Sequence, residues 1–160
     1  MPNQAFDVEY LDGSDRDADS IAALHADSWR RHYRGAYLDT YLDGDVVADR
    51  REVWRSRLTQ PRESQLTVSD LKRTGIGSRL LSETARRLLR LRPEGSLHLW
   101  VLDQNTAAQA FYAARGGSRV ETQLRGPFPG GGRALGHRYN WTDPTGLLSI
   151  PGITGDDELS

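Results

Sequence analysis

The stretch Leu71-Lys72-Arg73-Thr74-Gly75-Ile76-Gly77-Ser78-Arg79-Leu80-Leu81 stands between a short β-branched run and a long amphipathic segment. Gly75 and Gly77 have no Cβ, so the backbone can turn sharply and bring successive N–H groups close to a ligand. A helix that begins here directs its free N–H groups and the positive end of its dipole to the same place. Lys72, Arg73 and Arg79 add positive charge. The stretch predicts a pyrophosphate site, although two glycines before a helix are also compatible with an ordinary turn.

Apolar periodicity predicts the elements on both sides of this stretch. Strands are expected over residues 5–11, 66–68, 96–102, 119–124 and 135–141. One helix is expected to begin at residue 20, three to span residues 36–42, 46–58 and 76–91, and one to run from residue 105 to the glycines at 116–117. The segment beyond Asp143 is rich in Gly and Pro and ends in acidic residues. We therefore expect one domain over residues 1–142 and a flexible tail over 143–160.

Length and composition narrow the class of protein. The 160 residues suffice for one domain, and the net charge of −1 gives no general reason to expect nucleic acid or an anionic membrane as partner. No apolar run approaches the roughly 20 residues of a membrane helix. The chain has no Cys, and residues 1–10 do not resemble a signal peptide. A cytoplasmic location is expected.

The four histidines, His25, His32, His98 and His137, show no metal-ligand spacing. We expect no metal and a structural role for each of them.

A second motif follows the strand expected at 96–102. The run Leu99-Trp100-Val101-Leu102-Asp103-Gln104-Asn105, then Ala107, Ala110, Phe111-Tyr112 and Arg115-Gly116-Gly117, has the spacing of the GNAT superfamily of N-acyltransferases. Residues 72–77 resemble the cofactor signature of that family, in which Gln or Arg and two further residues precede Gly-any-Gly/Ala. Two motifs in the right order are more specific than either alone. The resemblance covers nearly all of residues 5–142 and implies an α/β fold with a mixed, mostly antiparallel sheet flanked by helices.

The resemblance implies a function and a set of site residues. Acetyl-CoA would donate an acetyl group to a primary amine of a small molecule or a protein N-terminus, which attacks the thioester directly. Asn105 would contact the pantetheine arm and also cap a helix, and Tyr112 would protonate the departing thiolate. The pyrophosphate would lie on Lys72, Arg73, Thr74, Gly75, Ile76, Gly77 and Ser78.

An aromatic series marks the expected acceptor side. Trp29, Tyr33, Tyr37 and Tyr41 recur at four-residue steps, where the family forms its acceptor pocket, although such a series is also typical of core packing. The first three are the expected substrate-binding residues. The family often uses a carboxylate on the preceding strands as general base. Glu63 and Asp70 are the nearest, and each has the character of a solvated surface charge.

The chain departs from the family between the early helices and the glycine stretch. The family has three strands there, which need roughly 25 residues, whereas this chain has only residues 62–70. We therefore expect one strand and a shortened sheet. The alternative function is an impaired remnant that binds CoA or a partner protein, with the open sheet edge completed by a homodimer.

Overall fold

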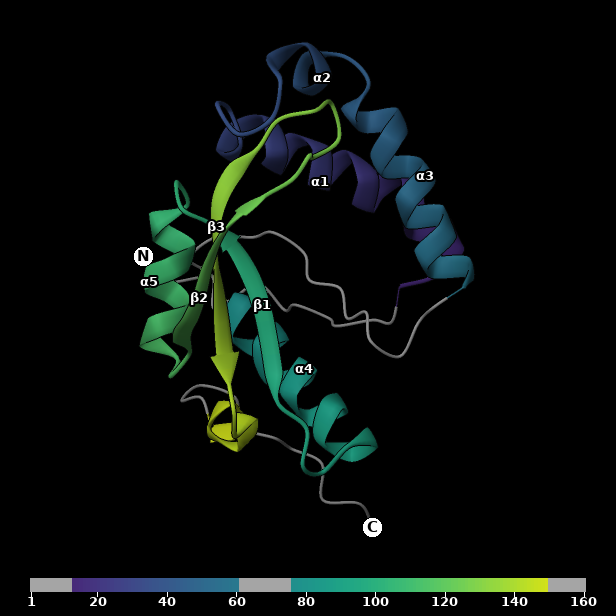
Figure 1. The fold of residues 1–160 in the computed structure, drawn as a ribbon. Coiled ribbons are helices and arrows are strands. Elements are labelled where there is room, and N and C mark those ends of the chain that lie inside the picture. Colours follow the sequence, from purple (N-terminus) through teal and green to yellow (C-terminus); the bar gives the residue numbers. More distant parts are fainter. Residues whose placement is uncertain (1–12, 61–75, 150–160) are drawn as a thin grey trace, which may run out of the picture.

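The computed structural model describes residues 13–60 and 76–149. In these ranges the chain forms a three-stranded antiparallel sheet with helices on both faces (Figure 1). The strands are β1 (Leu97–Leu102), β2 (Ser118–Arg125) and β3 (Ala134–Trp141), and the order across the sheet is β1-β3-β2. The expectation of an α/β fold with an antiparallel sheet is confirmed. No helix within the described ranges has the length and apolar character needed to cross a bilayer.

The helices follow the apolar periodicity closely. They are η1 (Asp15–Asp17), α1 (Ala18–His32), α2 (Asp39–Asp43), α3 (Val46–Thr59), α4 (Ile76–Leu91), α5 (Thr106–Ala114) and η2 (Pro144–Ser149). The predicted bounds of α4 are those observed, because its apolar residues repeat at helical spacing until Pro93 and Gly95.

Strand pairing fixes which side chains share a face. In the β1–β3 pair, Leu97 is opposite Trp141 and Leu102 is opposite Gly136. In the β2–β3 pair, Thr122 is opposite His137, and a bulge lies between Arg119 and Glu121. Since successive side chains of a strand alternate between faces, neighbouring residues of β3 belong to opposite sides of the sheet.

One face of the sheet is covered by α4, α5 and η2. Their common core contains Leu81, Ala85, Val101, Tyr139, Trp141 and Leu147, with Phe111 and Tyr112 packed against it. η2 corrects the expectation of a flexible tail from residue 143. Pro144 and Leu147 are almost completely buried, so residues 144–149 belong to the folded domain. Residues 150–160 lie outside the described ranges.

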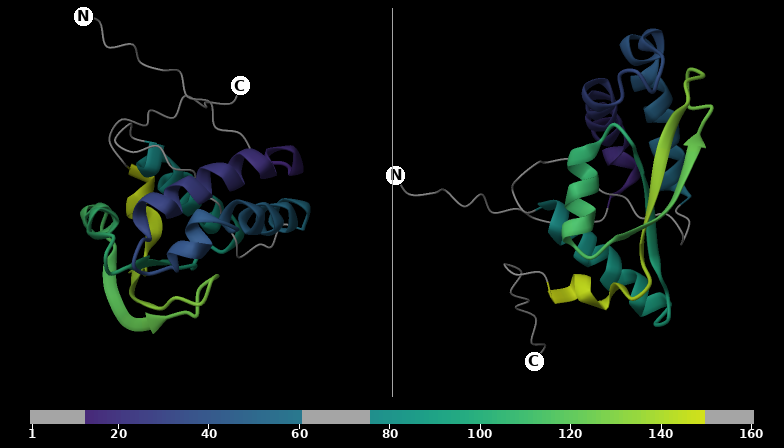
Figure 2. Two further views of the ribbon diagram at one scale, coloured as in Figure 1. Left: turned by 90° about the horizontal axis from the view of Figure 1, so that it is seen from above. Right: turned by 60° about the vertical axis from the view of Figure 1, so that its left-hand side comes forward.

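The first three helices form a separate layer at one end of the sheet (Figures 1 and 2). α1 and α3 lie side by side, with Ala18, Ala22 and Trp54 buried between them. A second cluster joins this layer to the sheet. It consists of Ala26, Trp29, Ala36, Tyr37, Leu42, Val46 and Leu102, with Phe128 and Ala134 packed against it.

The prediction of a helix over residues 36–42 is wrong in its first half. Gly35 has a φ of +84°, a left-handed conformation that ends helical geometry. Arg34 and Tyr37 form an isolated bridge, and Leu38 is extended, so α2 begins only at Asp39. The strands expected at 5–11 and 66–68, and with them the prediction of a single strand in 62–70, lie outside the described residues.

Candidate active site

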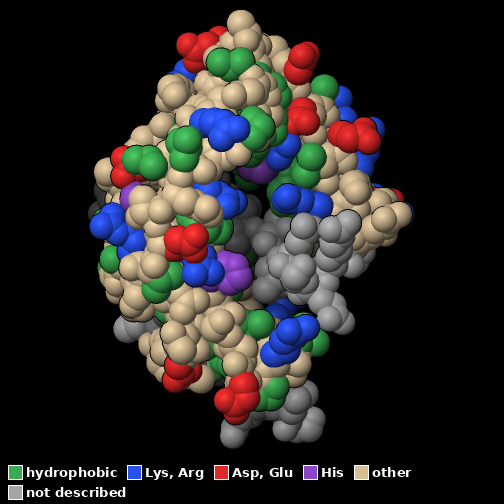
Figure 3. Space-filling model, viewed as in Figure 1, with side chains coloured by type: hydrophobic (Ala, Val, Ile, Leu, Met, Phe, Trp, Pro, Cys, Tyr) green, Lys and Arg blue, Asp and Glu red, His purple; other side chains and the backbone are tan. Residues whose placement is uncertain are grey.

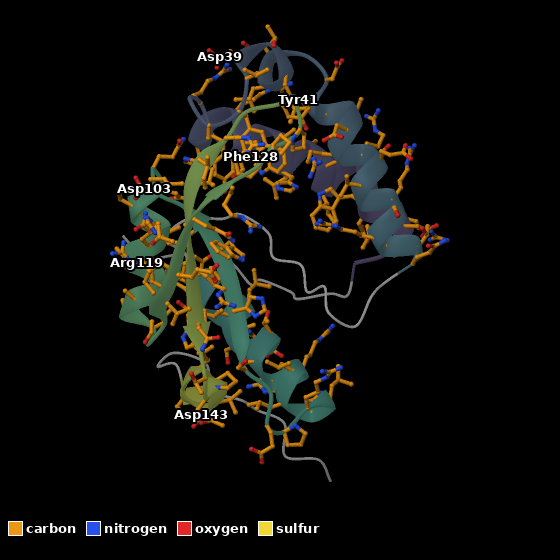
Figure 4. The ribbon with its side chains drawn as sticks, viewed as in Figure 1. Asp39, Tyr41, Asp103, Arg119, Phe128 and Asp143 are labelled. Carbon is orange, nitrogen blue, oxygen red and sulfur yellow. The ribbon has the colours of Figure 1, made fainter. Side chains whose placement is uncertain are left out.

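A pocket of about 270 Å³ lies between the end of α1, the segment that follows it and the sheet. Figure 3 shows the molecule hollowed between the upper helices and the sheet, and in Figure 4 Phe128 points from the β2–β3 loop toward α1. The lining residues are His25, Trp29, Tyr33, Tyr37, Trp100, Leu102, Arg125, Phe128 and Gly136. A ligand pocket usually has about 300–1,000 Å³. This space therefore suits a small acceptor and is too small for a whole coenzyme.

Of the four aromatic residues in the series, Trp29, Tyr33 and Tyr37 line this pocket, whereas Tyr41 is not among the lining residues. Tyr37 stacks on Phe128 with ring centroids 4.6 Å apart, and Trp29 lies 4.7 Å from Tyr37. Trp29 and Tyr37 are also almost fully buried. Trp29 and Tyr37 are therefore core residues that also line the pocket, and their role in binding an acceptor stays a prediction.

A close backbone contact fixes the position of Phe128. A Cβ on Gly132 would lie 2.1 Å from the carbonyl oxygen of Ala36, so the β2–β3 loop meets the segment before α2 almost backbone to backbone. Within the loop, the N–H of Phe128 donates to the Gly132 oxygen at 2.8 Å. Glycine at 132 thus permits the approach that closes the pocket.

The described lining carries positive charge. The guanidinium of Arg125 lies 4.2 Å from the centre of the Trp100 ring, and that of Arg50 lies 4.3 Å from the Trp29 ring on the helical side. Arg50 is paired with Asp49 at 2.5 Å. Arg125 is the one formally charged side chain among the described lining residues, and none of these residues is a carboxylate.

The hydrogen bond from Trp54 fixes the neutral His25 in the tautomer that donates from Nε2. Indole Nε1–H of Trp54 can only donate, and it lies 3.0 Å from Nδ1 of His25. The neutral imidazole therefore carries its proton on Nε2. Burial, aided by the charges of Arg50 and Arg57, lowers the pKa of His25 to about 4. A ring whose free nitrogen already bears a proton cannot accept one from an amine.

Tyr37 is also a poor base, because burial and the neighbouring Tyr33 raise its pKa and keep the hydroxyl protonated. Neither His25 nor Tyr37 therefore has the character of a general base.

The glycine stretch is described only from Ile76, where α4 begins, so Lys72, Arg73, Thr74 and Gly75 lie outside the described residues. Close packing favours glycine at position 77. A Cβ there would lie 3.2 Å from Cζ of Phe111. The hydroxyl of Ser78 is buried and accepts a hydrogen bond from Nε of Arg115 at 2.8 Å. For a ligand, Ile76, Gly77 and Ser78 offer the backbone N–H groups of the first turn of a helix, which have no partner within the helix itself.

Arg115 is the site residue that sequence reasoning missed. Its guanidinium lies 3.8 Å from the centre of the Phe111 ring and brings a positive charge to the start of α4. Arg115 is part of the second motif, but an arginine at the end of a helix gives no separate signal of its role.

Asn105 is the N-cap of α5, and its Oδ1 accepts a hydrogen bond from the N–H of Ala108 at 3.2 Å. The capping role is confirmed. The contact with a pantetheine arm stays a prediction.

Tyr112 lies in the core on the α5 side of the sheet, 6.0 Å from both Tyr139 and Trp141 between ring centroids. Burial raises the pKa of its hydroxyl, with a smaller contribution from Tyr33. The hydroxyl is therefore protonated at neutral pH.

Within the described ranges, no three His, Asp or Glu side chains gather as metal ligands would. Comparison with protein-family models gives no match to this chain, and comparison with curated protein sequences gives no significant similarity.

Proposed function

We propose that this protein is an acyl-CoA-dependent N-acyltransferase of the GNAT type, which transfers an acetyl group from acetyl-CoA to a primary amine. The observation that carries the proposal is the position of α5. Phe111 and Arg115 of this helix contact Gly77 and Ser78 at the start of α4, and Tyr112 is the residue that follows Phe111. A donor bound at the start of α4 would therefore lie beside the helix that carries Tyr112.

The start of α4 fits the phosphates of the donor. Backbone N–H groups at a helix start and a guanidinium are the usual ligands of phosphate oxygens, and this site supplies both. Acetyl-CoA, when bound, supplies an activated acyl group on a thioester. Tyr112 holds a proton at the hydroxyl oxygen that it can give to the leaving sulfur.

The pocket favours a particular class of amine. Because neither His25 nor Tyr37 of the described lining can take up a proton, we propose an acceptor that arrives unprotonated. At pH 7.5 about a third of an α-amino group (pKa about 7.8) is neutral, but only about one part in a thousand of an alkyl amine (pKa about 10.4). The aromatic walls suit an apolar body, and Arg125 suits a carboxylate. We therefore propose a short peptide N-terminus or a similar weakly basic amine as acceptor.

Calorimetry with acetyl-CoA, followed by release of free thiol, tests the proposal. The acceptors are a dipeptide with an N-terminal aromatic residue, the same dipeptide with an amidated C-terminus, and an alkyl diamine. We expect turnover to fall in that order. Absence of acetyl-CoA binding would refute the proposal, and binding without turnover on any amine would favour the impaired remnant.

Tyr112→Phe tests the general acid, because it keeps the ring and removes the hydroxyl. A thiol with a pKa of about 8.5 is already a tolerable leaving group, so we expect turnover to fall by about 10²-fold, the lower end of the range for general acids. Affinity for acetyl-CoA should stay nearly constant. An unchanged rate would leave Tyr112 with a packing role only.

A further inference from the structure

Three side chains outside the proposed acyltransferase site form a hydrogen-bonded series across the sheet. Oδ1 of Asp103 lies 2.6 Å from Nε2 of His137, and Nδ1 of His137 lies 2.8 Å from Oγ1 of Thr122. Asp103 follows β1, His137 lies on β3 and Thr122 lies on β2. The direct pairing of Thr122 with His137 brings the last two together.

The direction of each hydrogen bond follows from the chemistry of the groups. An ionised carboxylate only accepts, so Nε2 of His137 donates to Asp103. In the neutral imidazole Nδ1 is then bare and accepts the proton of the Thr122 hydroxyl. Carboxylate, imidazole and hydroxyl in this order are the arrangement that activates a hydroxyl nucleophile.

The imidazole at the centre of the series is buried, and the side chains at both ends are exposed. The backbone of Asp103 is held by its N–H, which donates to the Leu135 oxygen at 2.9 Å, and by its carbonyl, which accepts from Gln109 at 2.7 Å. The His137 side chain is 5% exposed, whereas that of Asp103 is 61% exposed and Thr122 is exposed. Figure 4 shows Asp103 beside the sheet near α5. A reagent in solvent can therefore reach the hydroxyl, while the base behind it is fixed.

We propose that Thr122 is a covalent acylation site, activated by His137 and positioned by Asp103, for activated acyl esters and thioesters. Oγ1 of Thr122 attacks the acyl carbon and forms a new C–O bond, while its proton passes to Nδ1 of His137. The bond to the leaving alkoxide or thiolate breaks, and the leaving group takes the electron pair. This step does not depend on the proposed transfer to amines.

The experiment uses the full chain and p-nitrophenyl acetate, which releases coloured p-nitrophenolate. Peptide mapping locates the acetyl group, and hydroxylamine, which cleaves esters and spares amides, separates Thr122 from Lys72 and the N-terminus. We expect Thr122 to be acetylated at least about 10²-fold faster than the exposed Thr106, in keeping with general-base catalysis.

Two sets of variants distinguish a loss of the acylation reaction from a loss of folding. Thr122→Val keeps the shape and should abolish the modification, whereas Thr122→Ser should restore it. His137→Gln can still donate to Asp103 and accept from Thr122 but cannot take up the proton, so acylation should fall by about 10²-fold or more. Circular dichroism confirms that each variant is folded. Equal labelling of Thr122 and Thr106, or an unchanged rate in folded His137→Gln, would overturn the proposal.

Discussion

The burial of His25 makes the stability of the fold depend on pH in a way that one substitution isolates. The pKa of His25 is about 4 in the folded protein and about 6.5 in an unfolded chain. Between these values the unfolded state binds a proton that the folded state does not. Stability therefore rises with pH through this window and is lost as the pH falls from about 6.5 toward 4.

The size of the effect follows from the two pKa values. The gap between 6.5 and about 4 corresponds to about 3 kcal/mol at roughly 1.4 kcal/mol per pH unit. His25 is partly exposed, and solvent screening reduces this figure to about 2 kcal/mol. His25→Gln removes the titration, while the amide oxygen of Gln can still accept the hydrogen bond from Trp54. Between pH 7 and pH 4, the free energy of unfolding should therefore fall by about 2 kcal/mol less in the variant than in the wild type.

Urea unfolding followed by circular dichroism at several pH values measures this difference. Asp17, Asp43 and Asp143, whose pKa values hydrogen bonds lower, titrate in both proteins and cancel in the comparison. His98→Gln, at an exposed position of β1, is the matched control and should behave as the wild type. If the difference in free energy of unfolding between wild type and His25→Gln is the same at pH 4 and pH 7, the reasoning is refuted.

Two further substitutions test the packing that surrounds the site. Leu147→Ala should lower the free energy of unfolding by about 2–5 kcal/mol, because Leu147 is 2% exposed in the core under α4. A loss below about 1 kcal/mol in urea unfolding would argue that η2 is not part of the folded domain. Gly132→Ala should lower the free energy of unfolding by about 1–3 kcal/mol, because the added Cβ would collide with the Ala36 oxygen. It should also raise KM for the amine, since Phe128 must shift. Gly146→Ala, where a Cβ meets nothing within 4 Å, is the control, and equal stability of the two variants would contradict the close approach.

Much of the helical structure could be predicted from local pattern. The bounds of α3 and α4 follow from apolar residues at helical spacing with Pro or Gly beyond each end. The error at residues 36–38 has a local cause too, since Gly35 adopts a left-handed conformation that composition does not reveal. The burial of Leu147 is different in kind, because it depends on α4 and on a strand more than 40 residues earlier in the chain.

The candidate site was predictable only where its residues are close in sequence. Trp29, Tyr33 and Tyr37 come from one continuous segment, so their spacing indicated a common location. Arg125 and Phe128 reach the same pocket through the register of the β2–β3 pair, which no local pattern specifies. The same holds for Thr122, His137 and Asp103, three separate positions that meet only when β3 takes its place between β1 and β2.

The alternation of β3 links the two sites in a way that constrains how related chains could diverge. Gly136 borders the aromatic pocket, and the next residue, His137, faces the other side of the sheet. A Cβ at position 136 would lie 2.7 Å from Cγ of Arg125 and would move that side chain off Trp100. One residue inserted into β3 ahead of this pair would exchange the two faces. A chain with that insertion would lose the pocket floor and the imidazole behind Thr122 in a single mutational step.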